Sequence, residues 1–410
     1  MGIQKTSTPK HLSEPATARL RTVTILGALT AFGPLSLDMY LPALPKLSQD
    51  LHTTTSMAQL SLTACLIGLA VGQLVAGPIS DVHGRKRPLL IGLILYAVTS
   101  FLCSISSSIE ALILLRFIQG LGGAAGIVIA RAMVRDMYSG TELTKFFAML
   151  MLVNGAAPIL APIAGGQLLK YTSWPGVFLV LGLIGVIMLL SVIAGLRETL
   201  PAERRSQGGL RQTLMTFGKL IRDRSFMGYA LSQGLISAGM FAYISGSPFV
   251  IQDLFGASAQ TFSLIFAING LGIIIAGQVT GRLAGRISET KLLQFGLIYA
   301  AIGGLLLLTM IWTGQGLIAI LIPLFVIVSS VGIVSASAFS LAMEKQGAVA
   351  GSASALQGLM SMLGGGLVAP LVGIGGSGTA LPMGIVIACA DIAALLCYWV
   401  MIARIRNKNV

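Results

Sequence analysis

This chain has very little charge for its length. Only 10% of its 410 residues are Asp, Glu, Lys or Arg, and 55% are hydrophobic, whereas a soluble protein carries about 25% charged residues. So few charges cannot cover the surface of a soluble protein of this size. The composition therefore excludes the ordinary soluble class and predicts a protein that lies in a membrane.

Histidine and cysteine are also scarce. The three histidines are scattered, and the four cysteines share no spacing typical of metal ligands: His11, His52, His83, Cys65, Cys103, Cys389 and Cys397. An intramembrane enzyme would need a nucleophile and base, or clustered carboxylates, at one depth. The sequence shows no such set, so we expect no enzyme, no metal and no cofactor.

Long apolar runs fill most of the chain. Each is about 20 residues long, enough to cross a hydrocarbon layer of ~30 Å as a helix, and in lipid the backbone can be satisfied only in this way. A channel would need a repeated ring-forming polar motif, which is not evident. We predict an all-α membrane protein with twelve spans, at 22–44, 58–81, 88–107, 110–134, 143–167, 175–197, 226–251, 259–281, 290–312, 316–341, 349–373 and 380–403.

The cations gather on one side of these spans. Tails and alternate loops hold 24 of the 27 lysines and arginines; Lys46 and Lys170 lie on the other side, and Arg116 lies within a span. By the positive-inside rule both termini should be cytoplasmic. The net charge of +13 has this topological cause, and without a basic patch interleaved with aromatic residues we expect no nucleic-acid binding.

A long interruption at 198–225 divides the chain into halves of six spans. The predicted order is a tail (1–21), a six-helix bundle (22–197), a linker (198–225), a second six-helix bundle (226–403) and a tail (404–410). Within the linker, Leu210, Leu214, Phe217 and Leu220 follow helical spacing, which suits an amphipathic helix on the membrane surface. Two such bundles with a substrate site between them are typical of secondary transporters.

Three ionisable residues lie well inside the spans: Asp38, Arg116 and Asp391. Each costs at least ~2.5 kcal/mol on insertion scales and is a functional candidate. Asp38 and Arg116 each lie about six residues from the outer end of a span, or about 9 Å deep. We expect these two to face each other, directly or through water, across the cleft of the first bundle; a purely structural ion pair that locks spans 1 and 4 is the alternative. Asp391 has no evident partner.

Opposed influences on Asp38 suggest a proton switch. Burial favours the neutral acid, and a nearby arginine favours the anion. If the cleft changes the exposure of Asp38, a proton and a cationic or polar cargo can compete for it. We therefore predict that Asp38 and Arg116 couple transport to protons.

The loop at residues 77–88 carries a family motif. It has Gly77, Asp81, Gly84, Arg85 and Lys86 at the positions typical of the loop between helices 2 and 3 in the major facilitator superfamily, and departs from that pattern at Val82. The resemblance implies a conformational latch. Asp81 would hold the N-terminal end of span 11 in the outward-open state, and Arg85 and Lys86 would hold the loop.

Other segments resemble one branch of that superfamily. Span 5 resembles the motif of proton-coupled exporters through Pro158, Pro162, Gly165 and Gly166, with Ala161 as a departure; span 4 matches at Leu112, Arg116, Gln119 and Gly120, and span 1 at Asp38, Tyr40, Pro42 and Pro45. The chain resembles the Bcr/CflA drug-resistance transporters. This implies a monomer in the bacterial inner membrane that exports bicyclomycin-like or phenicol-like drugs in exchange for protons.

The cargo residues follow from the same resemblance, because spans 1, 4, 7 and 10 usually line the cleft in this fold. The candidates are polar or pliable side chains at suitable depth: Asp38, Tyr40, Gln119, Asn154, Pro158, Gln233, Met240 and Tyr243. A proton-coupled exporter or uptake symporter of a small metabolite would use the same fold and the same Asp38, and remains the alternative.

Overall fold

The computed structural model describes residues 16–205, 210–346 and 349–403, and this part of the chain forms helices and no strand. The first half comprises α1 (Ala16–Thr30), α2 (Phe32–Asp38), η1 (Leu41–Ala43), α3 (Leu44–Asp50), α4 (Thr55–His83), α5 (Lys86–Ser104), α6 (Ile109–Met137), α7 (Gly140–Leu168) and α8 (Trp174–Gly195). The linker contains η2 (Ala202–Arg204) and α9 (Leu210–Arg222). The second half comprises α10 (Arg224–Pro248), η3 (Phe249–Leu254), α11 (Ala259–Leu283), α12 (Glu289–Trp312), α13 (Leu317–Met343), α14 (Ala350–Val372), η5 (Gly373–Gly375), α15 (Leu381–Tyr398) and η6 (Trp399–Ala403).

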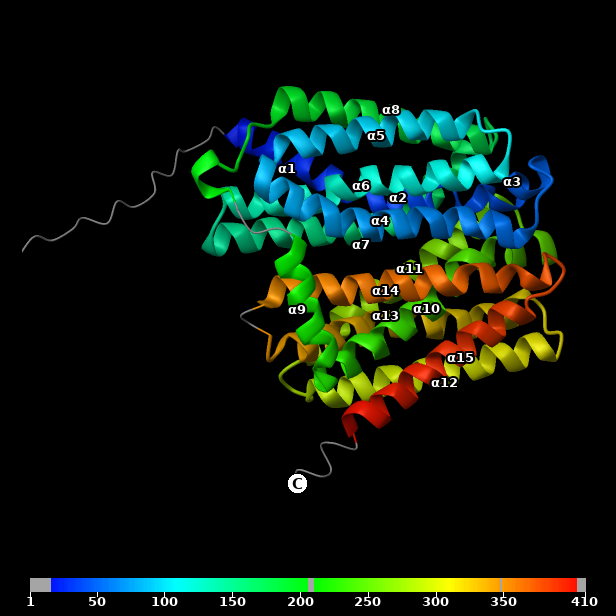
Figure 1. Cartoon of the computed structure of the whole chain (residues 1–410). Helices are drawn as coiled ribbons and strands as arrows, with labels where there is room; N and C mark the ends of the chain where they lie inside the picture. Colours follow the sequence, from blue (N-terminus) through cyan, green and yellow to red (C-terminus); the bar gives the residue numbers. More distant parts are fainter. Residues whose placement is uncertain (1–15, 206–209, 347–348, 404–410) are drawn as a thin grey trace, which may run out of the picture.

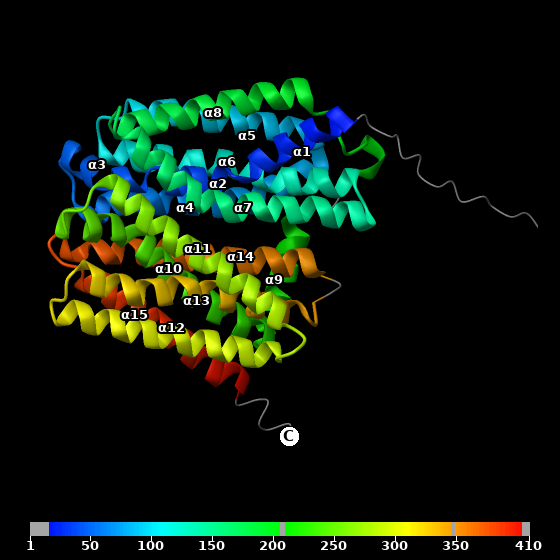
Figure 2. The ribbon, with the colours of Figure 1, turned by 180° about the vertical axis from the view of Figure 1, so that it is seen from behind.

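The described residues contain twelve helical segments that are long and apolar enough to cross a membrane, which confirms the predicted number. Eleven agree with the predicted bounds to within three residues, whereas the first runs over Leu20–Asp50 and not 22–44. Figure 1 shows the helices of the two halves as two stacked groups, and Figure 2 shows the same grouping from behind. The predicted tails at 1–21 and 404–410 fall largely outside the described residues.

The first span is broken by prolines. Pro34, Pro42 and Pro45 each lack the N–H that would bond the carbonyl four residues earlier. Accordingly α1, α2, η1 and α3 follow one another as short pieces, and α2 ends at Asp38. The carbonyl of Asp38 is the one that Pro42 cannot bond. The predicted proton-binding residue therefore lies at an interruption of a membrane helix.

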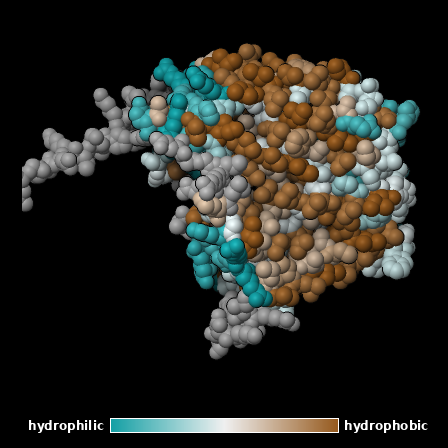
Figure 3. Space-filling view, viewed as in Figure 1, coloured by the Kyte–Doolittle hydropathy of each residue, from teal (hydrophilic) through white to brown (hydrophobic). Residues whose placement is uncertain are grey.

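The surface has an apolar flank and two hydrophilic ends (Figure 3). Large apolar side chains are exposed on the flanks, including Ile91, Leu152 and Leu367, as expected for a surface that faces lipid. We call one end the Arg85 end, because α4 finishes there, and the other the Asp50 end, because α3 finishes there. Helix α9 lies across the Arg85 end (Figure 1); its Phe217 and Leu220 are buried against the second half, while the side chains of Leu210 and Leu214 are outside the described set.

Glycines allow α4 and α6 to pack backbone to backbone. A Cβ added at Gly120 would lie 2.2 Å from the carbonyl oxygen of Cys65, and one at Gly68 would lie 2.1 Å from that of Phe117. Small residues permit such close contact between membrane helices. The face of α6 that carries Arg116 is thereby fixed against α4.

Replacing Gly120 with alanine should therefore destabilise the fold. The added methyl forces α4 and α6 apart, and overpacking of this kind costs about 1–3 kcal/mol. Thermal unfolding of the purified protein in detergent measures the loss. Gly358→Ala is the matched control, because a Cβ there meets nothing within 4 Å. Equal unfolding temperatures for the two variants would contradict the close contact.

Candidate functional site

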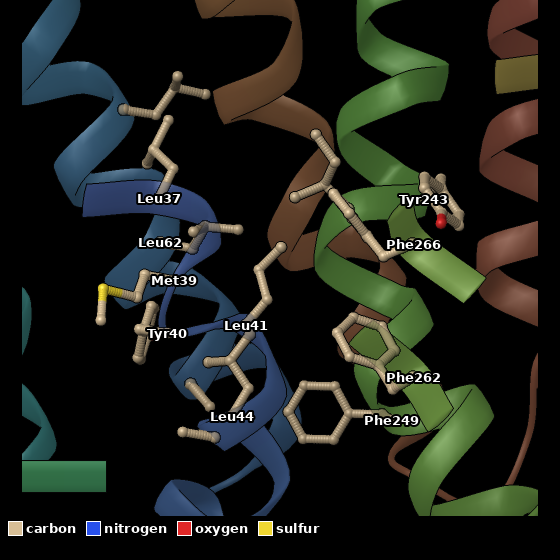
Figure 4. Packing of buried hydrophobic residues seen from close by; sticks show 14 of the residues in the cluster. Leu37, Met39, Tyr40, Leu41, Leu44, Leu62, Tyr243, Phe249, Phe262 and Phe266 are labelled. Carbon is tan, nitrogen blue, oxygen red and sulfur yellow. The ribbon is translucent and has the colours of Figure 1, made fainter. Parts of the chain in front are cut away.

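The two halves meet in an apolar cluster toward the Asp50 end. Leu41 and Leu44 on one side approach Phe249 and Phe262 on the other (Figure 4), within a cluster that also contains Leu37, Met39, Tyr40, Leu62, Tyr243 and Phe266. Gln59 Nε2 also donates to the carbonyl of Ser245 (3.0 Å). This end of the interface is closed in the structure.

The span 5 motif lies at the same closed end. A Cβ at Gly165 would lie 1.9 Å from the carbonyl oxygen of Met39, and one at Gly166 would lie 2.4 Å from Ser263 Oγ. Ser263 Oγ donates to the carbonyl of Pro162 (2.8 Å). These contacts place α7 directly against the broken first span and against α11 of the other half.

Arg116 is fully buried in the first half, with 0% of its surface exposed. Its Nη2 donates to the carbonyl of Ser36 (2.7 Å), and its Nη1 donates to Gln119 Oε1 (2.5 Å). Gln119 Nε2 in turn donates to Ser100 Oγ (2.6 Å). The guanidinium thus ties α6 to α2 and α5 through neutral oxygen atoms.

Aromatic rings enclose the same guanidinium. Its central carbon lies 4.7 Å from the ring centroid of Tyr40 and 5.4 Å from that of Phe178. Desolvated cation–π contacts contribute about 2 kcal/mol. Arg116 Nε has no hydrogen-bond partner within the described part of the chain. A buried cation is therefore held without a carboxylate.

The structure shows no direct pairing of Asp38 with Arg116. Among the described residues no salt bridge joins them, and the guanidinium binds the carbonyl of Ser36 instead. The cause is rotation about the helix axis. Ser36 directs its hydroxyl to Tyr96 of α5 (2.9 Å), and a residue two positions later points about 200° away.

The Asp38 residue is 7% exposed, and its side chain forms no ion pair within the described residues. Within the second half, Tyr243 of α10 stacks on Phe266 of α11, with ring centroids 5.5 Å apart. Asn269 of α11 donates to the Tyr243 hydroxyl (2.8 Å). Asn269 was not among the predicted site residues. The feature of the sequence that could have indicated it is a polar amide within an apolar run.

The other predicted cargo residues are dispersed. Tyr40 hydrogen-bonds Ser61 of α4, and Met240 packs against the boundary cluster. Gln233 instead accepts a hydrogen bond from Gln357 of α14. Asn154 donates to Leu150 of its own helix (2.8 Å) and Pro158 is half-buried in α7. Of the predicted set, Tyr40, Met240 and Tyr243 belong to or pack against the boundary cluster, whereas Gln119 lies inside the first half with Arg116 and Ser100.

Arg85 is the centre of the predicted latch. Its Nε donates to Asp136 Oδ2 (2.8 Å), and its Nη1 donates to Ser80 Oγ (2.8 Å) and Asp81 Oδ1 (2.5 Å). Burial lowers the pKa of Arg85, but these carboxylates outweigh it and raise the pKa above the ordinary arginine value. Lys86 Nζ donates to the carbonyl of Leu196 at the end of α8 (2.7 Å), a favourable place for a cation.

Two latch glycines lie beside this network. Gly84 has a φ of +86°, which a glycine adopts without strain. A Cβ there would lie 2.6 Å from Glu198 Oε2, so the position is also too crowded for a side chain. A Cβ at Gly77 would meet Val128 at 3.7 Å, an ordinary contact. The role of Asp81 toward α14 stays a prediction, since here its partner is Arg85.

Glu198 holds the start of α5 from the far end of the first half. Its carboxylate accepts from the backbone N–H groups of Arg85 (2.8 Å) and Lys86 (3.0 Å), and from those of Thr199 and Leu200 (3.0 Å each). Burial raises the pKa of Glu198, but the four N–H groups outweigh it and lower the pKa below its usual value. The residue thus joins the ends of α4, α5 and α8.

Two halves of six spans, with ionisable side chains buried at and near their boundary, have the architecture of a secondary transporter. The chain belongs to the Major Facilitator Superfamily, whose sequence profile matches residues 26–369. A solved structure of the nucleoside transporter NupG has the same fold, with a TM-score of 0.76 at 13% identity over 94% of this chain and 100% of that one.

Curated relatives narrow the family. The uncharacterized MFS-type transporter YdgK of Bacillus subtilis (strain 168) is 46% identical over 93% of this chain and 95% of that protein. A bicyclomycin resistance protein homolog of Haemophilus influenzae is 28% identical over 92% and 95%. A chloramphenicol resistance protein of Pseudomonas aeruginosa is 30% identical over 78% and 75%. The resemblance to Bcr/CflA-type transporters is thereby confirmed.

The lowered pKa of Glu198 predicts an acid-dependent stability. The ionised Glu198 carboxylate contributes to the free energy of unfolding above the pKa of about 4.3 that a glutamate has in the unfolded chain. This contribution is lost as the pH falls through the lower pKa of Glu198 in the folded protein. The free energy of unfolding of the wild type should therefore decrease across this window. Glu198→Gln should lack that part of the decrease and be less stable at neutral pH.

Denaturant unfolding at a series of pH values measures this difference. Glu203→Gln, at an exposed position of the same linker, is the control and should follow the wild type. A Glu198→Gln curve parallel to that of the wild type would refute the assignment.

Proposed function

We propose that this chain exports small amphipathic drugs from the bacterial cytoplasm in exchange for protons, by alternating access. It would act as a monomer in the inner membrane, with both termini in the cytoplasm and no nucleic-acid partner. Relatives named for bicyclomycin and chloramphenicol resistance support the cargo class. The observation that carries the coupling is the unpaired, buried carboxyl of Asp38 at the boundary between the halves.

The state of Asp38 must depend on how the halves pack. With the Asp50 end closed, the Asp38 residue is 7% exposed and has no counter-ion among the described residues, so the neutral acid is favoured. Separating the halves would admit water beside Asp38 and favour the anion. The same motion that changes access to the cargo site therefore changes proton affinity, which is sufficient for exchange.

Arg116 would assist from a fixed position. Its hydrogen bond to the carbonyl of Ser36 holds α2 two residues before Asp38. It also places a permanent positive charge in the same half, which favours the anion whenever water or cargo stabilises it. Arg116 would therefore keep the acid able to titrate without neutralising it by direct contact.

The boundary suits an amphipathic cargo. Tyr40, Met240 and Tyr243 would contribute aromatic and sulfur-containing surface, and Asp38 would contribute a polar group. Soft and aromatic linings accept varied apolar bodies. Closure by α7, α10 and α11 at the Asp50 end would alternate with closure at the Arg85 end, where Asp81 would act.

Transport into everted membrane vesicles tests the function. With the vesicle interior acidified, wild-type protein should accumulate a phenicol or bicyclomycin, and Asp38→Asn should lose this accumulation, because no proton can exchange there. Asp50→Asn is the matched control on the same span; it breaks only an exposed pair with Lys46 (3.0 Å), which contributes about 0–1 kcal/mol.

Two results would contradict the proposal. Full drug accumulation by Asp38→Asn would remove Asp38 from the coupling. Depletion of a metabolite from the acid interior, with no effect on drugs, would instead indicate a metabolite symporter.

A further inference from the structure

A second acid is buried in the other half. Asp391 on α15 is 1% exposed, and neither Oδ1 nor Oδ2 has a hydrogen-bond partner in the described structure. It lies between two neighbouring helices at glycines: a Cβ at Gly239 of α10 would be 3.0 Å from Oδ1, and one at Gly304 of α12 would be 3.2 Å from Oδ2. The carboxyl therefore occupies space that side chains would otherwise fill.

An ionised Asp391 would be very costly in this position, because an unpaired buried carboxylate loses its hydration without compensation. The neutral acid leaves only an unpaired hydroxyl and carbonyl, which is a much smaller loss. A metal ion fits poorly, since hard cations need six or more oxygen ligands and the described residues hold no cluster of three or more His, Cys, Asp or Glu side chains. The proton is the ligand that the site can hold.

No cation on the adjoining helices lies near this site. Helices α10, α12 and α14 pack against α15, and α14 carries no ionisable side chain. Arg224 on α10 and Glu289 and Lys291 on α12 lie 13 to 15 residues from Gly239 or Gly304, or roughly 20 Å away along the helix.

The other titratable groups on these helices are tyrosines and cysteines. Besides Tyr243, they are Tyr229, Tyr299, Cys389, Cys397 and Tyr398. None of them is a lysine, an arginine, a histidine or a second carboxylic acid. The charge state of Asp391 is therefore governed by how closely α10 and α12 exclude water from it.

Helix α10 connects this acid to the boundary. Gly239 lies one helical turn from Tyr243, which belongs to the boundary cluster. The same helix forms the contact from Gln59 to the carbonyl of Ser245 between the halves. A shift of α10 that reopens the boundary must therefore also change the packing over Asp391.

We propose that Asp391 is a second proton-binding site, which releases its proton to water when α10 moves and takes one back when α10 repacks. The step is a simple exchange between the carboxylic acid and the carboxylate plus a hydrated proton. The inference depends on the proton coupling proposed above and adds one proton to the cycle.

Counting protons per drug tests this directly. Reversal potentials in proteoliposomes, measured with opposing drug and pH gradients, give the ratio for the wild type and for Asp391→Asn. The amide is nearly isosteric and cannot release a proton, so the variant should exchange one proton fewer per drug. An unchanged ratio would overturn the inference while leaving the proposed function intact; absence of any proton exchange in the wild type would instead overturn the proposed function.

Infrared difference spectra provide a readout that does not need transport. Adding drug to the wild type should change two carboxylic-acid bands, one missing in Asp38→Asn and the other missing in Asp391→Asn. If Asp391→Asn does not fold, the wild type and Asp38→Asn still decide the question. A drug response that vanishes completely in Asp38→Asn would exclude titration of Asp391.

Discussion

The packing of Arg116 determines how the site is arranged. A charge inside the hydrocarbon layer must be satisfied by the protein itself, and here the carbonyl of Ser36, the amide of Gln119 and two aromatic rings do so. Because the guanidinium is bound to α2 through its backbone, the carboxylate of Asp38 is left free. The first half thus supplies a fixed cation and the boundary receives an unpaired acid.

The unpaired acid lies at the interruption of the first span. Three prolines stop the helix on either side of Asp38, so the acid lies where backbone and side chain can both rearrange with little loss of helix. Discontinuous membrane helices are typical of substrate and ion sites in transporters. Close contacts of α7 at Gly165 and Gly166 then convert any movement of the first span into movement against the other half.

The sequence was sufficient for the number of spans, the bounds of eleven of them and the burial of Asp38, Arg116 and Asp391, because these depend on hydropathy and length. The directions in which Asp38 and Arg116 point could not be predicted, since helix breaks at prolines change the orientation of each helical piece. Phe178 and Asn269 were missed because an aromatic or amide residue in an apolar run resembles ordinary packing. The hold of Glu198 on α5 could not be predicted, because it depends on contacts between residues 112 and 113 positions apart.

The central claim is that Asp38 exchanges its proton for drug at the boundary between the halves. The most direct measurement is proton release by purified protein in weakly buffered detergent when drug is added, followed with a pH indicator. The account predicts release from the wild type that rises with drug concentration to saturation, and clearly less release from Asp38→Asn at equal occupancy. The same release from both proteins would contradict it.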